Sequence, residues 1–231
     1  MRSVCDPVAD LAAADRAAMA TLLQRHFLGV TPEQFAADLA GKTHVLRLFD
    51  GASLVGFSTL AYARTDDAGE AIGVVHSGDT IVDPSAWHAA VLAPAWIAAV
   101  HALHGGRGAL WWLLICSGVR TWRFLPTCCR DFVPRPDGDP ILLARRDRLA
   151  HERYGAAFID GIVRLAAPQR LREGIATVPA HLATDALCAY FLSANPGWRE
   201  GDELCCLASL DPGNLTALGQ RQLRLGRRML A

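Results

Sequence analysis

The feature that most constrains this chain is residues 71–103, where a β-branched segment runs into a turn and then into a long apolar segment. The first part, AIGVVHSGDTIV, predicts a strand, Asp83-Pro84 marks a turn, and residues 86–104 predict a helix. A helix that follows a strand in this way presents free backbone N–H groups at its start, and such groups commonly hold phosphate. If the protein uses a cofactor, we expect it at this junction.

The flanking segments predict one mixed α/β domain. Upstream, a loose lead-in over residues 1–10 precedes helices over residues 12–27 and 31–41, the second with Thr31 as N-cap and Pro32 at its first position. Strands over residues 44–49, 53–63 and 71–82 form a meander, and the apolar run ALWWLLIC over residues 109–116 predicts a central strand covered on both faces. Downstream, residues 119–132 predict helical structure in which Pro126 starts or kinks a segment. The remaining residues predict a helix over 141–154, a strand over 161–165, a helix over 180–192, a strand over 202–210 and an amphipathic segment over 214–230. No shift in composition marks a boundary, so we expect residues 1–231 to form a single domain.

Composition narrows the classes of function. Hydrophobic residues make up 52% of the chain, and 23 Lys+Arg balance 23 Asp+Glu, so nothing favours a nucleic-acid or membrane partner. The seven cysteines include two adjacent pairs, which suits neither a disulfide framework nor a zinc site, and we expect most of them to be buried in the core. With no secretory signal and no apolar span of membrane length, the sequence predicts a soluble cytoplasmic protein without a metal.

The order of the predicted elements, two helices, a three-strand meander, a helix, a buried strand and another helix, resembles the GNAT acyltransferase superfamily. The resemblance covers residues 10–135 closely and residues 136–231 more loosely. Val82 and Pro84 fit the family's motif V-x-P-x-x-[QR]-x-x-G-x-[GA], whereas Trp87, His88 and Ala90 stand where it has its basic or amide residue and its glycines.

The resemblance implies a mostly antiparallel central sheet flanked by helices and a V-shaped opening between two central strands. That opening would admit the pantetheine arm of acyl-CoA, with an acyl carrier protein as another possible donor. The residues implied to hold the cofactor are Ile81, Val82, Trp87, His88, Ala89 and Ala90. A strand N–H would bind the developing oxyanion, and a Tyr acid often follows the next strand, but residues 119–132 contain no Tyr.

Polar residues interrupt the strand where the thioester would lie. His76-Ser77-Gly78-Asp79-Thr80 suggests a bulge that re-aims side chains into a site. We interpret His76 or Asp79 as the general base and Thr80 as a substrate contact; the alternative is a polar bulge satisfied by its neighbours.

The end of the strand over residues 109–116 supplies further candidates. Ser117 is a catalytic candidate or, alternatively, a helix N-cap. Arg120 and Arg123 lie three residues apart and are candidates to bind a carboxylate or phosphate, against the alternative of a solvated helix face. The tryptophans at 87, 96, 111 and 112 suggest either core packing, which we prefer, or a channel for a long acyl chain.

Three hypotheses follow. The first is an acyltransferase that passes an acyl group from acyl-CoA or an acyl carrier protein to an amine or hydroxyl of a small acceptor, working as a monomer or homodimer. The second is a non-catalytic module of the same fold that binds a ligand or a protein. The third is a Cys-dependent enzyme in which His76 activates Cys116, although a buried structural thiol is the preferred interpretation of Cys116.

Overall fold

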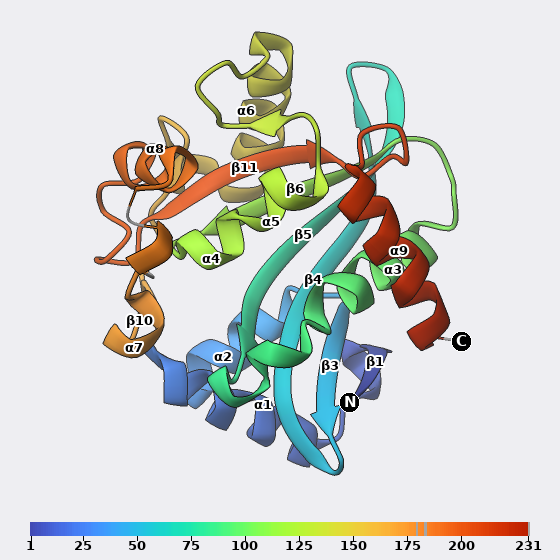
Figure 1. Cartoon of the computed structure of the whole chain (residues 1–231), viewed down its shortest axis with the longest axis vertical. Helices are drawn as coiled ribbons and strands as arrows, with labels where there is room; N and C mark the ends of the chain where they lie inside the picture. The colour runs from blue at the N-terminus through green and yellow to red at the C-terminus, as the bar shows by residue number, and fades with distance from the viewer. Residues whose placement is uncertain (179, 183, 231) are drawn as a thin grey trace.

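The three strands predicted between residues 44 and 82 are confirmed as an antiparallel meander. In a computed structural model, which describes residues 1–230 except 179 and 183, they are β3 (His44–Asp50), β4 (Ser53–Asp67) and β5 (Glu70–Val82). Gly51 has a φ of 57° in the tight turn between β3 and β4, a conformation in which a residue without a Cβ is not strained. The meander forms one half of the central sheet (Figure 1).

The other strands extend this meander into a nine-stranded sheet of order β1-β3-β4-β5-β6-β11-β9-β8, with β7 on β11. Among the strand pairs in the described part of the chain, β5–β6 alone is parallel, so the sheet is mostly antiparallel, as predicted. β2 and β10 form a separate two-stranded pair. The remaining strands are β1 (Arg2–Pro7), β2 (Phe27–Leu28), β6 (Leu110–Cys116), β7 (Phe132–Val133), β8 (Phe158–Ile159), β9 (Ile162–Val163), β10 (Arg170–Leu171) and β11 (Glu203–Ser209).

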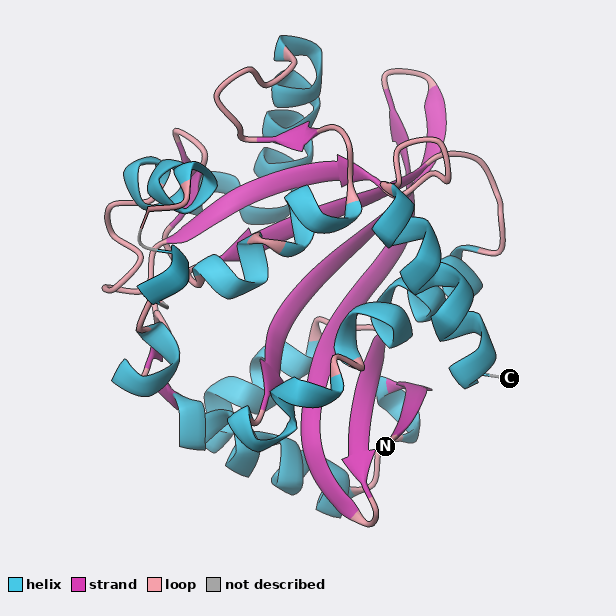
Figure 2. Cartoon of the chain, in the orientation of Figure 1, coloured by secondary structure: helices cyan, strands magenta, loops and turns pink. Residues whose placement is uncertain are grey.

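Helices cover both faces of the sheet (Figure 2). They are α1 (Ala13–His26), α2 (Pro32–Ala40), α3 (Leu92–His104), α4 (Val119–Trp122), α5 (Phe124–Cys128), α6 (Pro140–Tyr154), α7 (Glu173–Ala176), α8 (Ala186–Ala194) and α9 (Ala217–Leu230). As predicted, Thr31 caps α2 by accepting a hydrogen bond from the Gln34 N–H, 3.1 Å away. No helix in the described residues is long and apolar enough to cross a bilayer.

Successive side chains along a strand point to opposite faces of the sheet, so the hydrophobic core consists of separate clusters on the two faces. On β3, Val45 packs with α1 and α2, whereas its neighbours Leu46 and Leu48 pack on the α3 side. On β6, Trp112 belongs to the α3 side and Leu113 to a third cluster under α6. Because β6 is covered on both faces, its sequence is apolar without interruption, which confirms the interpretation of ALWWLLIC.

Several predicted boundaries were wrong, for identifiable reasons. Residues 2–7 are not a loose lead-in, because β1 pairs with β3 along its whole length. The helix predicted from residue 180 begins at Ala186, because the Asp185 carboxylate accepts the Cys188 N–H at 2.8 Å and caps it. The segment 119–132 divides into α4 and α5, with Pro126 in the first turn of α5.

The helix predicted over residues 86–104 also begins later than expected. Residues 84–89 form a 3₁₀ turn, Ala90 takes a left-handed conformation with φ 48°, and α3 starts at Leu92. The turn is fixed by Asp83, whose carboxylate accepts hydrogen bonds from the Ser85 N–H (3.0 Å) and O–H (2.6 Å). These hydrogen bonds hold the pKa of Asp83 below its ordinary value, so the loop carries a negative charge.

Candidate active site

The central strands β5 and β6 separate halfway along their length. They pair in parallel from Gly73 and Leu110 to Ser77 and Leu114, and beyond that point the two strands diverge (Figure 1). A register shift between β4 and β5 at Ser58 accompanies the divergence. The β6-facing edge of β5 from residue 78 to residue 82 therefore has no strand partner among the described residues.

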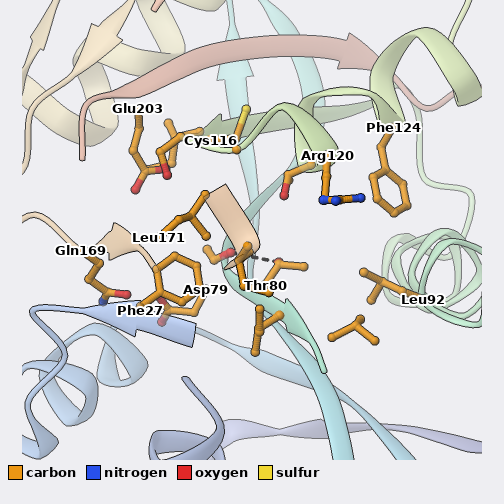
Figure 3. Close-up of a pocket in the computed structure, with 18 of the residues that line it drawn as sticks. Phe27, Asp79, Thr80, Leu92, Cys116, Arg120, Phe124, Gln169, Leu171 and Glu203 are labelled. Carbon is orange, nitrogen blue, oxygen red and sulfur yellow. Dashed lines mark hydrogen bonds between the residues drawn. The ribbon is translucent and has the colours of Figure 1, made fainter. Parts of the chain in front are cut away.

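A cavity of about 560 Å³ occupies this gap. It is lined by the diverging ends of β5 and β6, the loop before α3, the start of α4, the end of α6 and the segment around β10 and α7. Figure 3 shows two ends: Glu203, Gln169 and Asp79 gather at one, and Arg120, Phe124 and Leu92 at the other.

The first end is acidic. Asp79 comes from β5 and Glu203 from the start of β11, and both line the cavity together with Asp38 from α2. Asp79 Oδ2 is buried and has no hydrogen-bond partner in the described part of the chain, while Gln169 reaches toward Asp38 at 3.4 Å. Burial raises the pKa of Asp79 and, reinforced by the Asp79 charge, raises the pKa of Glu203 to about 8. Glu203 can therefore exchange a proton near neutral pH.

Lys42 lies at the same end. A Cβ placed on Gly78 would lie 2.6 Å from Lys42 Cε and 2.7 Å from Nζ, so the lysine side chain rests on the strand at its only residue without a Cβ between 74 and 82. Burial lowers the pKa of Lys42, and the nearby carboxylates partly offset that effect.

His76 faces Tyr154 inside the fold. The imidazole is 3% exposed; Nδ1 donates to the Leu113 carbonyl at 3.1 Å, and the Tyr154 hydroxyl donates to Nε2 at 3.1 Å. Burial and the neighbouring Arg153 and Lys42 charges hold the pKa of His76 well below its ordinary value. Burial likewise holds the pKa of Tyr154 well above its ordinary value, so the phenol keeps its proton. His76 is thus a neutral, internally bonded group rather than a strong base.

The other end of the cavity opens beside the loop before α3. Trp87 is 38% exposed, its indole N–H donates to the Val82 carbonyl at 2.8 Å, and the Arg120 guanidinium stacks on its ring at 4.4 Å. Val91, the N-cap of α3, supplies no side-chain cap, so the N–H groups of Leu92 and Ala93 receive no acceptor from it, and Pro94 at the third position carries no N–H. Trp87 and Arg120, together with this helix start, form the mouth of the cavity.

The surroundings of Cys116 at the end of β6 lack the features that would activate a nucleophilic thiol. Cys116 is buried, burial raises its pKa well above the ordinary value, and no hydrogen bond joins it to His76 in the described structure. Ser117 lines the cavity but does not cap α4, because Gly118 is the N-cap. These features favour a structural Cys116, as preferred from the sequence.

Nine of the twelve site residues predicted from the sequence line this cavity: His76, Asp79, Thr80, Ile81, Val82, Trp87, Ala90, Ser117 and Arg120. Thr80 is partly engaged, with its hydroxyl 2.7 Å from Ser58 Oγ. His88, Ala89 and Arg123 are not part of the lining, and Arg123 pairs instead with Asp185 at 3.1 Å. Arg120 and Arg123 were expected to share one helix face, but only Arg120 reaches the cavity.

Sequence reasoning missed Lys42, Tyr154, Gln169 and Glu203, which come from segments far apart in the chain. The one available signal was that Lys42 is the only lysine. The preferred interpretation of the tryptophans, core packing, holds for Trp96 and Trp112, which pack together at 4.5 Å, while Trp111 stacks against Arg145 at 4.5 Å. Of the four, Trp87 alone lines the cavity. No group of three or more potential metal ligands occurs among the described residues.

Neither protein-family models nor curated protein sequences match the chain. The solved structures that resemble it include a GNAT-family N-acetyltransferase from Escherichia coli in complex with CoA (17% identity, TM-score 0.40, 54% of this chain and 68% of that one) and an acyl-CoA N-acyltransferase from Pseudomonas aeruginosa (19%, 0.38, 58% and 87%).

Another is a conserved Enterococcus faecalis protein described as a probable N-acyltransferase (11% identity, TM-score 0.42). The alignment covers 57% of this chain but only 33% of that protein. At such identities and scores the likeness carries no conclusion about substrate or catalysis. The strand order and the divergence of β5 from β6 agree with the fold expected from the sequence, a mostly antiparallel central sheet with an opening between two central strands.

Proposed function

We propose that this protein transfers an acyl group from the thioester of acyl-CoA, or of an acyl carrier protein, to an amine or hydroxyl of a small acceptor. The observation that carries the proposal is the unpaired edge of β5 over residues 78–82, which faces a cavity between two diverging strands. An extended ligand arm that contains amide groups, such as pantetheine, can pair with such an edge as an added strand would.

The mouth of the cavity suits the phosphate end of the donor. The uncapped start of α3 offers backbone N–H groups and a favourable dipole, and Arg120 brings a guanidinium to the same opening. The exposed Trp87 ring offers a stacking surface beside it. We therefore assign Ile81 and Val82 to the pantetheine arm, and Trp87, Ala90 and Arg120 to the phosphate end.

The acidic end suits the acceptor. In an acyl transfer the acceptor nitrogen or oxygen attacks the thioester carbon, the C–S bond breaks, and the acceptor loses a proton while the thiolate gains one. Glu203, with a pKa of about 8, is the strongest candidate for the base, and Asp79 orients or neutralises the acceptor beside it. Tyr154 holds a proton at its hydroxyl and is a candidate donor to the thiolate, with His76 positioning it.

Calorimetry with CoA, acetyl-CoA and longer acyl-CoAs tests the donor site directly. We expect binding in the micromolar to high-micromolar range and slow release of free CoA, measured chromatographically because seven free cysteines would react with a thiol reagent. Absence of binding at millimolar ligand, with pantetheine thioesters also inert, would contradict the proposal. Cytoplasmic location and a monomeric or homodimeric state stay predictions.

One observation favours the second candidate, a non-catalytic binding module. The Trp87 indole already occupies the Val82 carbonyl, and the loop forms a 3₁₀ turn in place of a glycine-rich one. A module of this kind would bind a ligand or a protein without turning over a thioester. Acyl transfer to any amine or hydroxyl in the presence of acyl-CoA would exclude it.

A further inference from the structure

The acidic end of the cavity also holds a cation whose presence the acyl-transfer scheme does not require. Lys and Arg total 23 and Lys42 is the single lysine, so the other 22 cationic side chains are arginines. The one lysine does not lie on the open surface but lines the cavity, with its ammonium beside Gly78. A compact ammonium fits against the strand at this point, where a planar guanidinium would need more room.

The hydrogen-bonding capacity of Lys42 is unused. Within the described residues its side chain forms no hydrogen bond and no ion pair, although Asp79, Asp38 and Glu203 all lie near enough to affect its pKa. The partly buried ammonium faces the cavity, so a bound group that supplies an acceptor can reach it and form a charge-assisted hydrogen bond.

The complementary group at the same end is Asp79. Its Oδ2 is buried without a donor, and Figure 3 shows Asp79 at the same end of the cavity as Glu203. The cavity therefore presents an unused donor and an unused acceptor of opposite charge. A ligand with a single charge would pair with only one of these two groups and would be repelled by charges near the other. A simple amine would lie near the positive charges of Lys42 and Arg153, and a simple acid would lie near the negative charges of Asp79 and Asp38.

We infer that the acceptor is a small zwitterion, an amine that also carries a carboxylate, with its amino group held at Asp79 and its carboxylate at Lys42. The role of this ligand as the acceptor rests on the proposed acyl transfer, whereas its chemical class follows from the charges of the cavity alone. In the reaction the ammonium gives one proton to Glu203, its nitrogen attacks the thioester carbon, the C–S bond breaks, and the second proton of the nitrogen leaves with the thiol. The products are an N-acyl amino acid and a free thiol.

Calorimetry without any acyl donor tests this ligand class. The probes are three zwitterions, L-alanine, β-alanine and 4-aminobutyrate, and for each one its decarboxylated amine (ethylamine for both alanines, propylamine for 4-aminobutyrate) and its deaminated acid (propionate or butyrate). We expect at least one zwitterion to bind at least tenfold more tightly than either of its halves. If an amine binds as tightly as its zwitterion, or if none of the three zwitterions binds, the inference is wrong.

Variants assign the two charges. Lys42→Met should remove the preference for the zwitterion over the amine, and Asp79→Asn should remove the preference for the zwitterion over the acid. Gly78→Ala should weaken zwitterion binding without changing any charge, because the new Cβ displaces the lysine side chain. Arg123→Met, which removes a cation outside the cavity, is the matched control and should bind as the wild type does. A Lys42→Met protein that unfolds at the wild-type temperature and keeps the preference would overturn the inference.

The two proposals fail separately. Zwitterion binding without any binding of CoA or pantetheine thioesters would contradict acyl transfer and leave the ligand class standing. Thioester binding and turnover with plain amines preferred would support acyl transfer and contradict the zwitterion.

Discussion

At the acidic end of the cavity, burial changes the pKa values of individual side chains from those that their residue types ordinarily have. Glu203 is an ordinary glutamate whose carboxylate loses water on folding and lies near the Asp79 charge, and both effects favour its protonated form. Lys42 is affected in the opposite direction by the same loss of water. Burial thus favours the uncharged form of both groups, because it raises the pKa of Glu203 and lowers that of Lys42.

Glu203 gives the first prediction at this scale. Its pKa rises from an ordinary 4.5 to about 8 on folding, so the folded state holds a proton that the unfolded chain releases. The stability that this difference contributes is present below about pH 4.5 and is lost as the pH rises through 8. We expect the wild-type melting temperature to fall more between pH 5 and pH 8 than that of Glu203→Gln, which is neutral throughout.

Activity provides a second measurement on the same variant. The wild-type rate should rise with pH through about 8, whereas Glu203→Gln should lose roughly 10²–10⁴-fold in turnover and lose the rise. Equal pH dependence of stability in the two proteins would show that folding does not raise the pKa of Glu203, and the expected rise of the rate through pH 8 would then have another origin.

Arg120 and Arg123 give the second prediction, because the fold separates two residues that the sequence placed on one face. Arg120 reaches the mouth of the cavity and stacks on Trp87, whereas Arg123 pairs with Asp185 away from it. Arg120→Ala should weaken CoA binding by about 10- to 100-fold in calorimetry, the range typical of one charge-assisted contact. Arg123→Ala is the matched control and should bind CoA as the wild type does; equal losses in both variants would remove Arg120 from the phosphate end.

Among the elements, the crossing of α3 and α9 supports the cavity from behind. α9 packs along α3, and the two helices are in close contact where Gly226 meets Pro94 and Ala98. A Cβ at Gly226 would overlap the Pro94 carbonyl and lie 2.7 Å from the Ala98 Cβ. The missing side chain therefore sets the distance between the helices and, through α3, the position of the cavity mouth.

Gly226→Ala gives the prediction at this scale. Although alanine favours a helix by about 1 kcal/mol over glycine, overpacking at the crossing should dominate and lower the free energy of unfolding by about 1–3 kcal/mol in urea titrations. Gly174→Ala, in α7 with no atom within 4 Å of the added Cβ, is the control and should leave stability unchanged or slightly higher. An unaffected or more stable Gly226→Ala would mean that α9 does not pack tightly on α3.

For the molecule as a whole, the sheet order joins the two ends of the sequence. β11 pairs with β6 in the middle of the sheet, and α9 packs on α3, so segments after residue 200 complete a core begun before residue 120. Neither part covers its apolar surface alone, which is the physical basis for treating residues 1–231 as one domain.

Unfolding experiments test this prediction. Tryptophan fluorescence, which reports on six residues between positions 87 and 198, and far-UV circular dichroism should follow one coincident urea transition. A chain truncated after residue 211, which lacks α9, should lose that cooperative transition. Two separated transitions in the full chain would divide it into two units.

The sequence by itself determined the elements whose signals are local. The apolar run in β6, the meander with its Asp50-Gly51 turn and the Thr31-Pro32 helix start each follow from neighbouring residues, and so does the strand–turn–helix order around Asp83. Residues on β5 and at the loop could therefore be predicted as candidates, and Asp79, Val82 and Trp87 among them line the cavity.

Only the tertiary structure decided which side chains meet. Lys42, Tyr154 and Glu203 come from a loop, a helix end and a strand start separated by more than 40 residues each, and no local pattern links them. Pairing across the sheet also turned residues 2–7 into β1. Enclosure by distant segments removes water from these groups and shifts their pKa values, and neither effect exists until the chain has folded.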